Sequence, residues 1–490
     1  MQRFFTLTEA REKLVKKELS VTQLIEEAVT TINTTEKKLH AFNTLTLEQA
    51  LEKAAKIDRQ GTVKDIGPMG GIPIGYKDNF CTKGVRTTAS SNILGNYIPI
   101  YNATVVDRYE KAGAISVGKL NCDAFAHGSS GENSDFGPTK NPWNLEYVPG
   151  GSSSGSGALV ASGGAFLATG TDTGGSIRLP ASFCGIVGLK PSYGRVSRYG
   201  IVAMTSSTDS IGCLTRSVKD AALALEVTAG KDIHDGTTVD KKVESYTSFC
   251  GKPVKGMTIG IPKEYFVKGI EKEVVDATEK AIEVYKSLGV KIKEVSLPHT
   301  EYATAVYYIV TPSEVSSNLA RYDGVRYGYS DTEAPDMLSR YFNSRRDGFG
   351  AEAKRRIMIG TYALSSGYYD AYYKKAQQVR TLVCDDFKKA FQKVDLLLAP
   401  VSPTLPFKIG EKASDPLQMY LSDILTIAVN LAGVPGLAIP CGFAKGLPIG
   451  IQVIAPQFEE AKMFQAGYAY EQETKWHTMH PTLGENNGKK

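Results

Sequence analysis

The sequence predicts an α/β fold in which one domain holds a central mixed β-sheet covered by helices on both faces. Short apolar runs typical of buried strands alternate with segments of helical periodicity along most of the chain. With 42% hydrophobic and 22% charged residues among 490, the composition matches soluble globular proteins and provides a large core. We find no internal repeat, and only one Gly/Ser-rich region departs from ordinary complexity, which favours a single unit.

The first part of the chain, residues 1–62, is predicted to be helical. Capping-box spacing is present at Ser20–Gln23 and at Thr46–Gln49. One apolar stripe at helical spacing follows the first of these, formed by Leu24, Ile25, Ala28, Val29 and Ile32. We expect this helical part to end near Gly61.

Residues 65–220 are predicted to form the core that carries the chemistry. Here the pattern changes to short apolar runs of β type, separated by Gly- and Ser-rich turns. The runs are Gly71–Tyr76, Ala114–Val117, Ala165–Thr169 and Ile186–Leu189. We expect each of them to be a strand of the sheet.

Residues 255–480 are predicted to supply the remaining strands and the helices of a substrate pocket, after a linker-like stretch near Asp232–Pro253. The pattern begins with a strand at Met257–Ile261 and a helix at about Glu271–Ser287. Two helical or mixed segments then lead into apolar runs: Asp385–Val394 into Asp395–Pro400, and Leu421–Ala432 into Gly436–Pro440 and Ile449–Ile454.

Charge and cysteine content exclude several classes of protein. The net charge of +5 comes from 57 Lys+Arg against 52 Asp+Glu without a basic cluster, which disfavours direct nucleic-acid binding. The seven cysteines form no CxxC pair, so we expect neither a zinc site nor a disulfide framework, and no metal. Residues 1–18 lack a signal-peptide core and no apolar run could span a bilayer, so a cytoplasmic protein with no membrane partner is expected.

Two neighbouring segments rich in Gly and Ser stand out, Pro149–Ala158 and Gly170–Pro180. A Gly/Ser-rich stretch is most often a flexible loop or a phosphate cradle. No lysine follows these glycines as a P-loop requires, and their spacing does not match a dinucleotide-binding fingerprint. The segments therefore require another explanation.

Acyl transfer suits the second segment. Backbone amides of Thr173, Gly174, Gly175 and Ser176 are free of bulky neighbours and are candidates for an oxyanion hole. One donor of this kind is worth about 3–4 kcal/mol of transition-state stabilisation. Ser176 is then the natural nucleophile.

The base for such a serine is better sought in a lysine than in a histidine. Of the six histidines only His127 is near either Ser/Gly segment in sequence, and it is more simply explained as structural. Lys77 ends an apolar run, where burial would depress its pKa from about 10.4 towards 7. Taken alone, Lys77 is more simply an ion-paired lysine.

Three motifs taken together resemble the amidase signature family. They read GGIPIGYKDN, then PGGSSSGSGALVASG, then GTDTGGSIRLPASFCGIVGLKPSYGRVSRYG, and the likeness extends from about Leu24 to Thr474. The resemblance implies that Ser176 attacks an amide carbonyl, that Ser152 in a cis peptide relays the proton, and that Lys77 accepts it. Ser154 departs from the family pattern, which usually has Gly, and we expect only a slightly altered turn.

Within this family the chain is most similar to the glutaminase subunits of tRNA-dependent amidotransferases. The segments that carry this likeness are 348–360, 432–442 and 471–477. It implies that Arg356 binds the glutamine α-carboxylate and Asp423 the α-ammonium, with Tyr307 and Ser129 in the pocket. A guanidinium fork suits a carboxylate, although Arg356 in a helix or Asp423 near a helix start could equally be structural.

The resemblance also implies partners. We expect glutamine as substrate and a heterotrimer with B and C subunits, in which ATP, Mg²⁺ and Glu-tRNA or Asp-tRNA bind the partner subunit, because this chain has no nucleotide fingerprint. No cofactor is expected in the chain itself. Two alternatives stay open here: a free-standing amidase acting on other carboxamides, and a non-catalytic module that kept the fold.

Overall fold

A single sheet crosses the computed structural model, which describes residues 4–61, 66–266, 269–413 and 415–483. Within these residues eleven strands lie in the order β1-β3-β2-β4-β6-β5-β10-β11-β9-β7-β8. The edge strand β1 pairs antiparallel with β3. Strands β3-β2-β4 and β9-β7-β8 pair in parallel, and the strands between these two groups pair antiparallel. The sheet is therefore mixed, as the sequence predicts.

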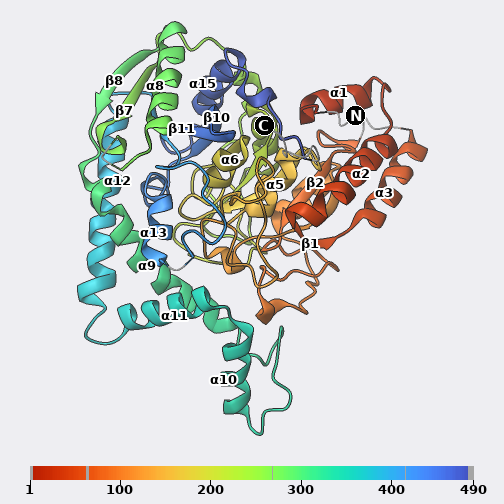
Figure 1. The fold of residues 1–490 in the computed structure, drawn as a ribbon, viewed down its shortest axis with the longest axis vertical. Coiled ribbons are helices and arrows are strands. Elements are labelled where there is room, and N and C mark those ends of the chain that lie inside the picture. The colour runs from red at the N-terminus through yellow and green to blue at the C-terminus, as the bar shows by residue number, and fades with distance from the viewer. Residues whose placement is uncertain (1–3, 62–65, 267–268, 414, 484–490) are drawn as a thin grey trace.

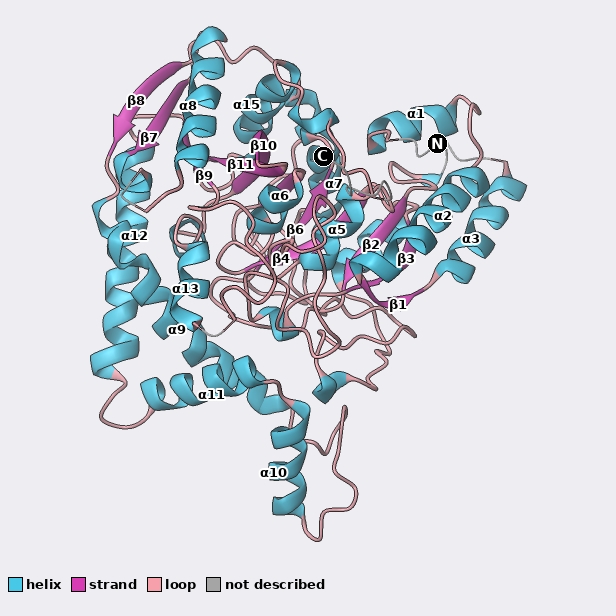
Figure 2. Ribbon diagram, in the orientation of Figure 1, coloured by secondary structure: helices cyan, strands magenta, loops and turns pink. Residues whose placement is uncertain are grey.

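The predicted apolar runs are strands in the structure. The eleven strands of the described residues are β1 (Phe42–Leu45), β2 (Pro73–Lys77), β3 (Ile115–Leu120), β4 (Leu167–Asp172), β5 (Val187–Lys190), β6 (Ser210–Thr215), β7 (Thr258–Pro262), β8 (Lys291–Val295), β9 (Leu396–Pro400), β10 (Gly436–Ala444) and β11 (Leu447–Ile454). Strands β2, β4, β5, β9 and β11 are buried along their whole length, because helices cover the sheet (Figure 2).

The helices of the described residues lie on both faces of the sheet and around its ends. They are α1 (Leu7–Val15), α2 (Val21–Leu39), α3 (Leu47–Gln60), α4 (Thr104–Lys111), α5 (Ser154–Ala161), α6 (Arg178–Cys184), α7 (Val218–Thr228), α8 (Lys272–Ser287), α9 (Ala303–Asn318), α10 (Met337–Gly348), α11 (Ala351–Leu364), α12 (Lys375–Phe391), α13 (Pro416–Tyr420), α14 (Ile427–Leu431) and α15 (Glu460–Gln472). Figure 1 shows α10 projecting away from the body of the molecule.

Alternation along β10 shows how one strand serves two helical layers. Successive side chains of a strand point to opposite faces. Gly436 lies against Arg178 of α6, and a Cβ at Gly436 would be 3.2 Å from that side chain. The next residue, Leu437, packs against Gly467 of α15 on the other face. Helices α6 and α15 therefore cover opposite sides of the same strand.

Two local predictions for the first part of the chain were wrong. Ser20 does form the predicted capping box, but Thr46 forms none: its hydroxyl donates to the Ser116 carbonyl (3.2 Å), which ties the start of α3 to β3. The segment 1–62 also contains strand β1, so it is not wholly helical. Its predicted boundary at residues 62–65 lies outside the described residues.

The stretch Asp232–Pro253 packs on the body of the protein. Its Tyr246 is buried, and the buried Arg195 guanidinium donates to the Tyr246 hydroxyl and to the carbonyls of Lys241 and Lys242. An arginine that satisfies several oxygens holds a segment without regular structure in one place. The prediction of a linker is therefore corrected.

Candidate active site

The lysine and the second Gly/Ser segment meet at one edge of the sheet. Lys77 is the last residue of β2, and β4 runs parallel beside it. Because parallel strands end at the same edge, the residues that close β4 lie next to Lys77. The Lys77 amide donates to Thr169 Oγ1 (2.9 Å), and Lys77 Nζ donates to Thr171 Oγ1 (2.8 Å).

The Lys77 amine is buried among hydroxyl groups. Its Nζ lies 2.8 Å from Ser152 Oγ and 3.0 Å from Ser153 Oγ. Burial lowers the pKa of Lys77 to about 8, because nearby thiol and carboxylate groups offset only part of the desolvation. A lysine with this pKa is deprotonated often enough near neutral pH to accept a proton. Among the described residues Lys77 Nζ forms no ion pair within 4.0 Å, so the simpler explanation of an ion-paired lysine does not describe this side chain.

The first Gly/Ser segment reaches the lysine through a cis peptide bond. That bond joins Gly151 and Ser152, as the family resemblance implies. Ser152 is fully buried, and the Ser153 amide donates to the carbonyl of Ser176 (3.2 Å), so the two serine segments are held together by a backbone hydrogen bond. Ser154 begins α5, and its hydroxyl faces the Asn121 carbonyl (3.4 Å).

The loop from Thr173 to Ser176 is held rigidly from behind. Asp172 accepts hydrogen bonds from the amides of Ile177 and Arg178 and forms a fully buried ion pair with the Arg178 guanidinium (3.0 Å). Burial raises the pKa of Asp172, but the positive charge of Arg178 lowers it by more, so that the pKa is about 2. The Thr173 hydroxyl is fixed by Asp209 (2.7 Å). The Gly174 carbonyl accepts a hydrogen bond from Thr426 Oγ1.

Gly174 and Gly175 occupy positions where a side chain would not fit. A Cβ at Gly174 would lie 2.8 Å from the Tyr307 hydroxyl, and one at Gly175 would lie 2.3 Å from Thr426 Oγ1. In the part of the chain that the structure describes, neither glycine amide donates a hydrogen bond to protein. Backbone amides that have no acceptor and lie beside a candidate nucleophile are suited to stabilise a negative oxygen.

A cavity of about 140 Å³ collects most of the predicted binding residues. It is lined by Gly128, Ser129, Glu132, Asn133, Tyr308, Glu352, Arg355, Arg356, Lys412, Ala413, Met419, Tyr420 and Asp423. Among the described residues of this lining, Arg356 Nη1, Asp423 Oδ1 and Glu132 Oε2 are buried without a hydrogen-bond partner. Burial, together with the Asp172 carboxylate, raises the pKa of Asp423 well above its usual range. Buried polar atoms of this kind normally have partners, so the cavity is built for a polar ligand.

Arg356 is oriented by residues that the sequence did not point to. Its Nε donates to Glu352 Oε1 (2.8 Å), one turn earlier on α11, and that carboxylate also accepts from the Tyr420 hydroxyl (3.1 Å). The rings of Tyr308 and Tyr420 stack 4.0 Å apart, and each lies 5.8 Å from the guanidinium carbon. The spacing of Glu352 and Arg356 was the one available signal, since oppositely charged residues four apart share a helix face.

The remaining predicted residues are placed differently. Ser129 lines the cavity and donates to the Met419 carbonyl (3.3 Å). Tyr307 lies against Gly174, beside the loop, and is not part of the cavity lining. His127 is buried beside Phe125, and its ring nitrogens have no hydrogen-bond partner within the described chain, so it forms no hydrogen bond to either serine.

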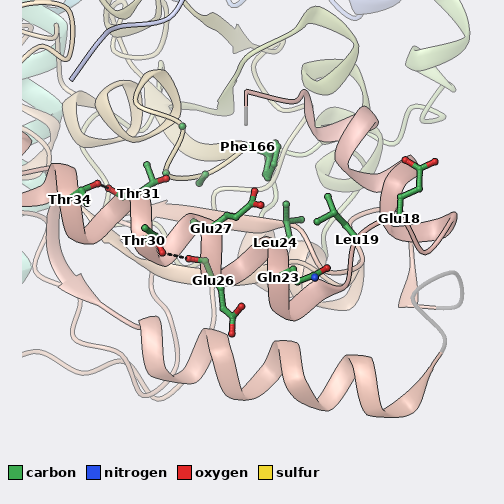
Figure 3. A pocket seen from close by; sticks show the side chains of 14 residues that line it. Glu18, Leu19, Gln23, Leu24, Glu26, Glu27, Thr30, Thr31, Thr34 and Phe166 are labelled. Carbon is green, nitrogen blue, oxygen red and sulfur yellow. Dashed lines mark hydrogen bonds between the residues drawn. The ribbon is translucent and has the colours of Figure 1, made fainter. Parts of the chain in front are cut away.

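A larger hollow of about 580 Å³ lies elsewhere, between residues 18–19, α2 and residues 163–166 (Figure 3). Its walls carry glutamates, threonines and Phe166, but no residue predicted for the chemistry. Over the described residues, no group of three or more His, Cys, Asp or Glu could hold a metal ion. The small cavity, whose lining residue Asp423 lies against Gly175 of the 173–176 loop, is therefore the candidate active site.

Comparison with known proteins agrees with this geometry. A family model described as Amidase matches residues 23–464. The chain belongs to the amidase signature family. The A subunit of glutamyl-tRNA(Gln) amidotransferase from Heliobacterium modesticaldum is 54% identical to this amidase over 480 residues, which cover 98% of this chain and 99% of the relative.

Two further relatives agree. The protein of the same name from Geotalea daltonii is 55% identical over 479 residues, covering 98% of this amidase and 99% of the relative. The crystal structure of the corresponding A subunit from Thermotoga maritima superposes with a TM-score of 0.82 at 41% identity, over 98% of each chain. In the described part of this amidase, no helix is both long and apolar enough to cross a membrane.

Proposed function

We propose that this amidase hydrolyses glutamine through an acyl-enzyme on Ser176, as the glutaminase subunit of a tRNA-dependent amidotransferase. One observation carries the proposal: Arg356 and Asp423 each present an unpartnered buried atom to the same small cavity. A ligand with a carboxylate and an ammonium group satisfies both atoms. A guanidinium binds carboxylates, and an ammonium charge beside Asp423 lowers its raised pKa and so favours the carboxylate that binds it. An α-amino acid has these two groups on one carbon.

The proton path follows the hydroxyl contacts of the lysine. Ser176 Oγ bonds to the side-chain carbonyl carbon of glutamine while its proton passes to Ser152 Oγ, and the Ser152 proton passes to neutral Lys77 Nζ. The 2.8 Å separation of Lys77 Nζ and Ser152 Oγ is a hydrogen-bond distance that permits this transfer. Amides of Thr173, Gly174 and Gly175 receive the negative oxygen of the tetrahedral intermediate.

The same groups then act in reverse. Lys77 returns its proton through Ser152 to the amide nitrogen, the C–N bond breaks, and ammonia leaves a glutamyl ester on Ser176. Water, deprotonated along the same path, attacks this ester and releases glutamate with the Ser176 hydroxyl restored. Each turnover therefore yields one glutamate and one ammonia.

The ammonia is proposed to pass to a partner subunit. Relatives at 54% identity are named as subunits of an amidotransferase, which supports a multi-subunit assembly. In our proposal B and C subunits complete a heterotrimer, and the partner binds ATP, Mg²⁺ and Glu-tRNA(Gln), Asp-tRNA(Asn) or both. A free-standing amidase of other carboxamides is not favoured. Its substrates need not carry the α-carboxylate and α-ammonium groups that Arg356 and Asp423 are suited to bind.

The test compares glutamine with a simple aliphatic carboxamide that lacks the α-amino and α-carboxyl groups. We expect Arg356→Ala to lower kcat/KM for glutamine about 10- to 100-fold, mainly through KM, because a charged hydrogen bond is worth about 1.5–3 kcal/mol. Hydrolysis of the simple amide should change little. The matched control is Arg346→Ala, whose guanidinium is exposed on α10 and pairs with Asp347.

Glutamate release is measured for the chain alone and for the chain with its co-purified partner, ATP and charged tRNA. We expect release with the partner to exceed release by the chain alone. If Arg356→Ala keeps its fold, checked by thermal melting, and still turns over glutamine at the wild-type rate, the substrate assignment fails.

A further inference from the structure

Asp123 lies between Ser152 and the substrate cavity. It does not line the cavity and does not belong to the predicted triad. It follows β3 and is fully buried. Its carboxylate accepts from the Gly131 amide at 3.1 and 3.0 Å, one distance to each oxygen, and from the Asn133 amide at 2.9 Å. A carboxylate that accepts several backbone amides fixes the loop that supplies them.

The same residue holds the cis serine from its backbone. The Asp123 amide donates to the carbonyl of Ser152 (3.2 Å). Its carboxylate packs directly on the preceding residue, since a Cβ at Gly151 would lie 2.1 Å from Asp123 Oδ2. The Gly151 amide in turn donates to the Ser129 carbonyl (2.7 Å). The cis peptide and the cavity loop are thus joined through Asp123.

The loop that Asp123 fixes is one wall of the cavity. Gly128, Ser129, Glu132 and Asn133 all line it. A Cβ at Gly128 would lie only 2.4 Å from the carboxyl carbon of Asp123, so the loop and the carboxylate are in close contact.

Asp123 also contributes charge to the relay. In their ionised forms Cys122, Asp123, Asp172 and Asp209 each favour protonated Lys77, but burial raises the pKa of the Cys122 thiol to about 12, so that thiol is uncharged near neutral pH. Asp172 is already neutralised by Arg178 and Asp209 is bonded to Thr173. Burial raises the pKa of Asp123 to about 6, so the carboxylate is ionised above neutral pH.

We propose that Asp123 is a positioning residue that holds Ser152 and the 128–133 cavity wall in a single arrangement, and whose charge acts on the base Lys77. The proposal rests on the proposed function, in which Ser152 relays protons and the cavity binds glutamine. Asp123 does not touch the reacting atoms and acts through the groups it holds.

Asp123→Asn tests both parts. Asparagine keeps the size of the side chain, but its amide group replaces one acceptor with a donor that faces backbone N–H groups. Hydrogen bonds to a charged group are worth an amount that corresponds to roughly 10–100-fold in an equilibrium or rate constant. We expect kcat/KM for glutamine to fall within that range, with KM raised as the cavity wall loosens. The acidic limb of the pH profile should also move to lower pH, because loss of a negative charge makes Lys77 easier to deprotonate.

Asp135→Asn is the matched control. Asp135 also anchors a loop, accepting from Ser91 Oγ (3.0 Å) and the Asn92 amide (2.9 Å), but its carboxylate has no contact with Ser152 or Lys77. We expect this variant to keep the wild-type KM and pH profile. An equal change in both variants would overturn the proposal.

A second variant separates position from charge. Gly128→Ala places a methyl group against the Asp123 carboxylate and keeps its charge, so KM should rise while the acidic limb stays in place. A second measurement does not involve glutamine: the rate at which a fluorophosphonate labels Ser176 is measured as a function of pH, and the acidic limb of this profile is compared between variants. The proposal is overturned if Asp123→Asn leaves that limb unmoved. If wild type does not hydrolyse glutamine but the labelling limb still shifts, the proposed function fails and the role of Asp123 stands.

Discussion

Lys77 combines two effects that act on one amine. Full burial removes water and favours the neutral form, while three hydroxyl groups within 3.0 Å give the amine partners that accept or donate in either protonation state. A carboxylate in contact with the amine would have kept it protonated. Hydroxyl partners leave it able to accept a proton and to return it.

The pH dependence of activity follows from this environment. Only neutral Lys77 accepts the Ser152 proton, and its pKa is lowered to about 8, so kcat/KM should rise as pH increases through about 8. A lysine at its ordinary pKa would place this rise about two units higher. Steady-state rates across roughly pH 6 to 10 measure it. A profile that is flat across pH 8 would contradict the assignment of Lys77 as base.

Reactive residues that stand in a sequence motif could be predicted from the sequence. Residues that act through tertiary contacts could not. Glycine content pointed to Ser176, and the resemblance of the three motifs to the amidase signature family implied the roles of Lys77 and Ser152. Asp123 was missed because its partners are backbone amides, which have no signature in the sequence. Tyr420 was missed because its contact with Glu352 joins residues far apart in the chain.

At the scale of elements, α11 connects the packing of the protein to its substrate cavity. One face of α11 carries Arg356 into the cavity, and Gly360 one turn later lies against α9. A Cβ at Gly360 would be 1.8 Å from the Pro312 carbonyl oxygen. The two helices therefore approach so closely that only glycine fits at their contact.

Gly360→Ala should separate these helices. Overpacking of this kind costs roughly 1–3 kcal/mol of unfolding free energy, and the shift of α11 should also raise KM for glutamine through Arg356. Denaturant melts and steady-state kinetics measure the two effects. Gly236→Ala is the control, since a Cβ there meets nothing within 4 Å. Equal stability of Gly360→Ala and wild type would show that α9 and α11 are less tightly packed than described.

Elements were predictable where the pattern is strong. Apolar runs such as β2, β4 and β9 are buried on both faces, so their composition identified them. Strand β8 has the sequence KIKEV and lies at the end of the sheet, largely exposed, so it has no apolar run to detect. Thr46 has capping-box spacing, but a tertiary hydrogen bond to β3 takes its hydroxyl.

At the scale of the whole molecule, the site depends on the sheet to bring distant segments together. Lys77 comes from β2, Ser176 from the loop after β4, Arg356 from α11 and Asp423 from the short helix at 421–423. The mixed sheet and its two helical layers were predicted from alternation and composition. The order of the eleven strands was not, because pairing between strands far apart in sequence leaves no local pattern.

The central claim is that Ser176 becomes an acyl nucleophile through Ser152 and Lys77. The most direct measurement treats the protein with an electrophilic glutamine analogue and locates the adduct by peptide mass mapping. We expect wild type to be modified at Ser176, and Lys77→Ala at least about 100-fold more slowly, as for loss of a general base. An adduct on another residue, or equal labelling of Lys77→Ala, would contradict the account.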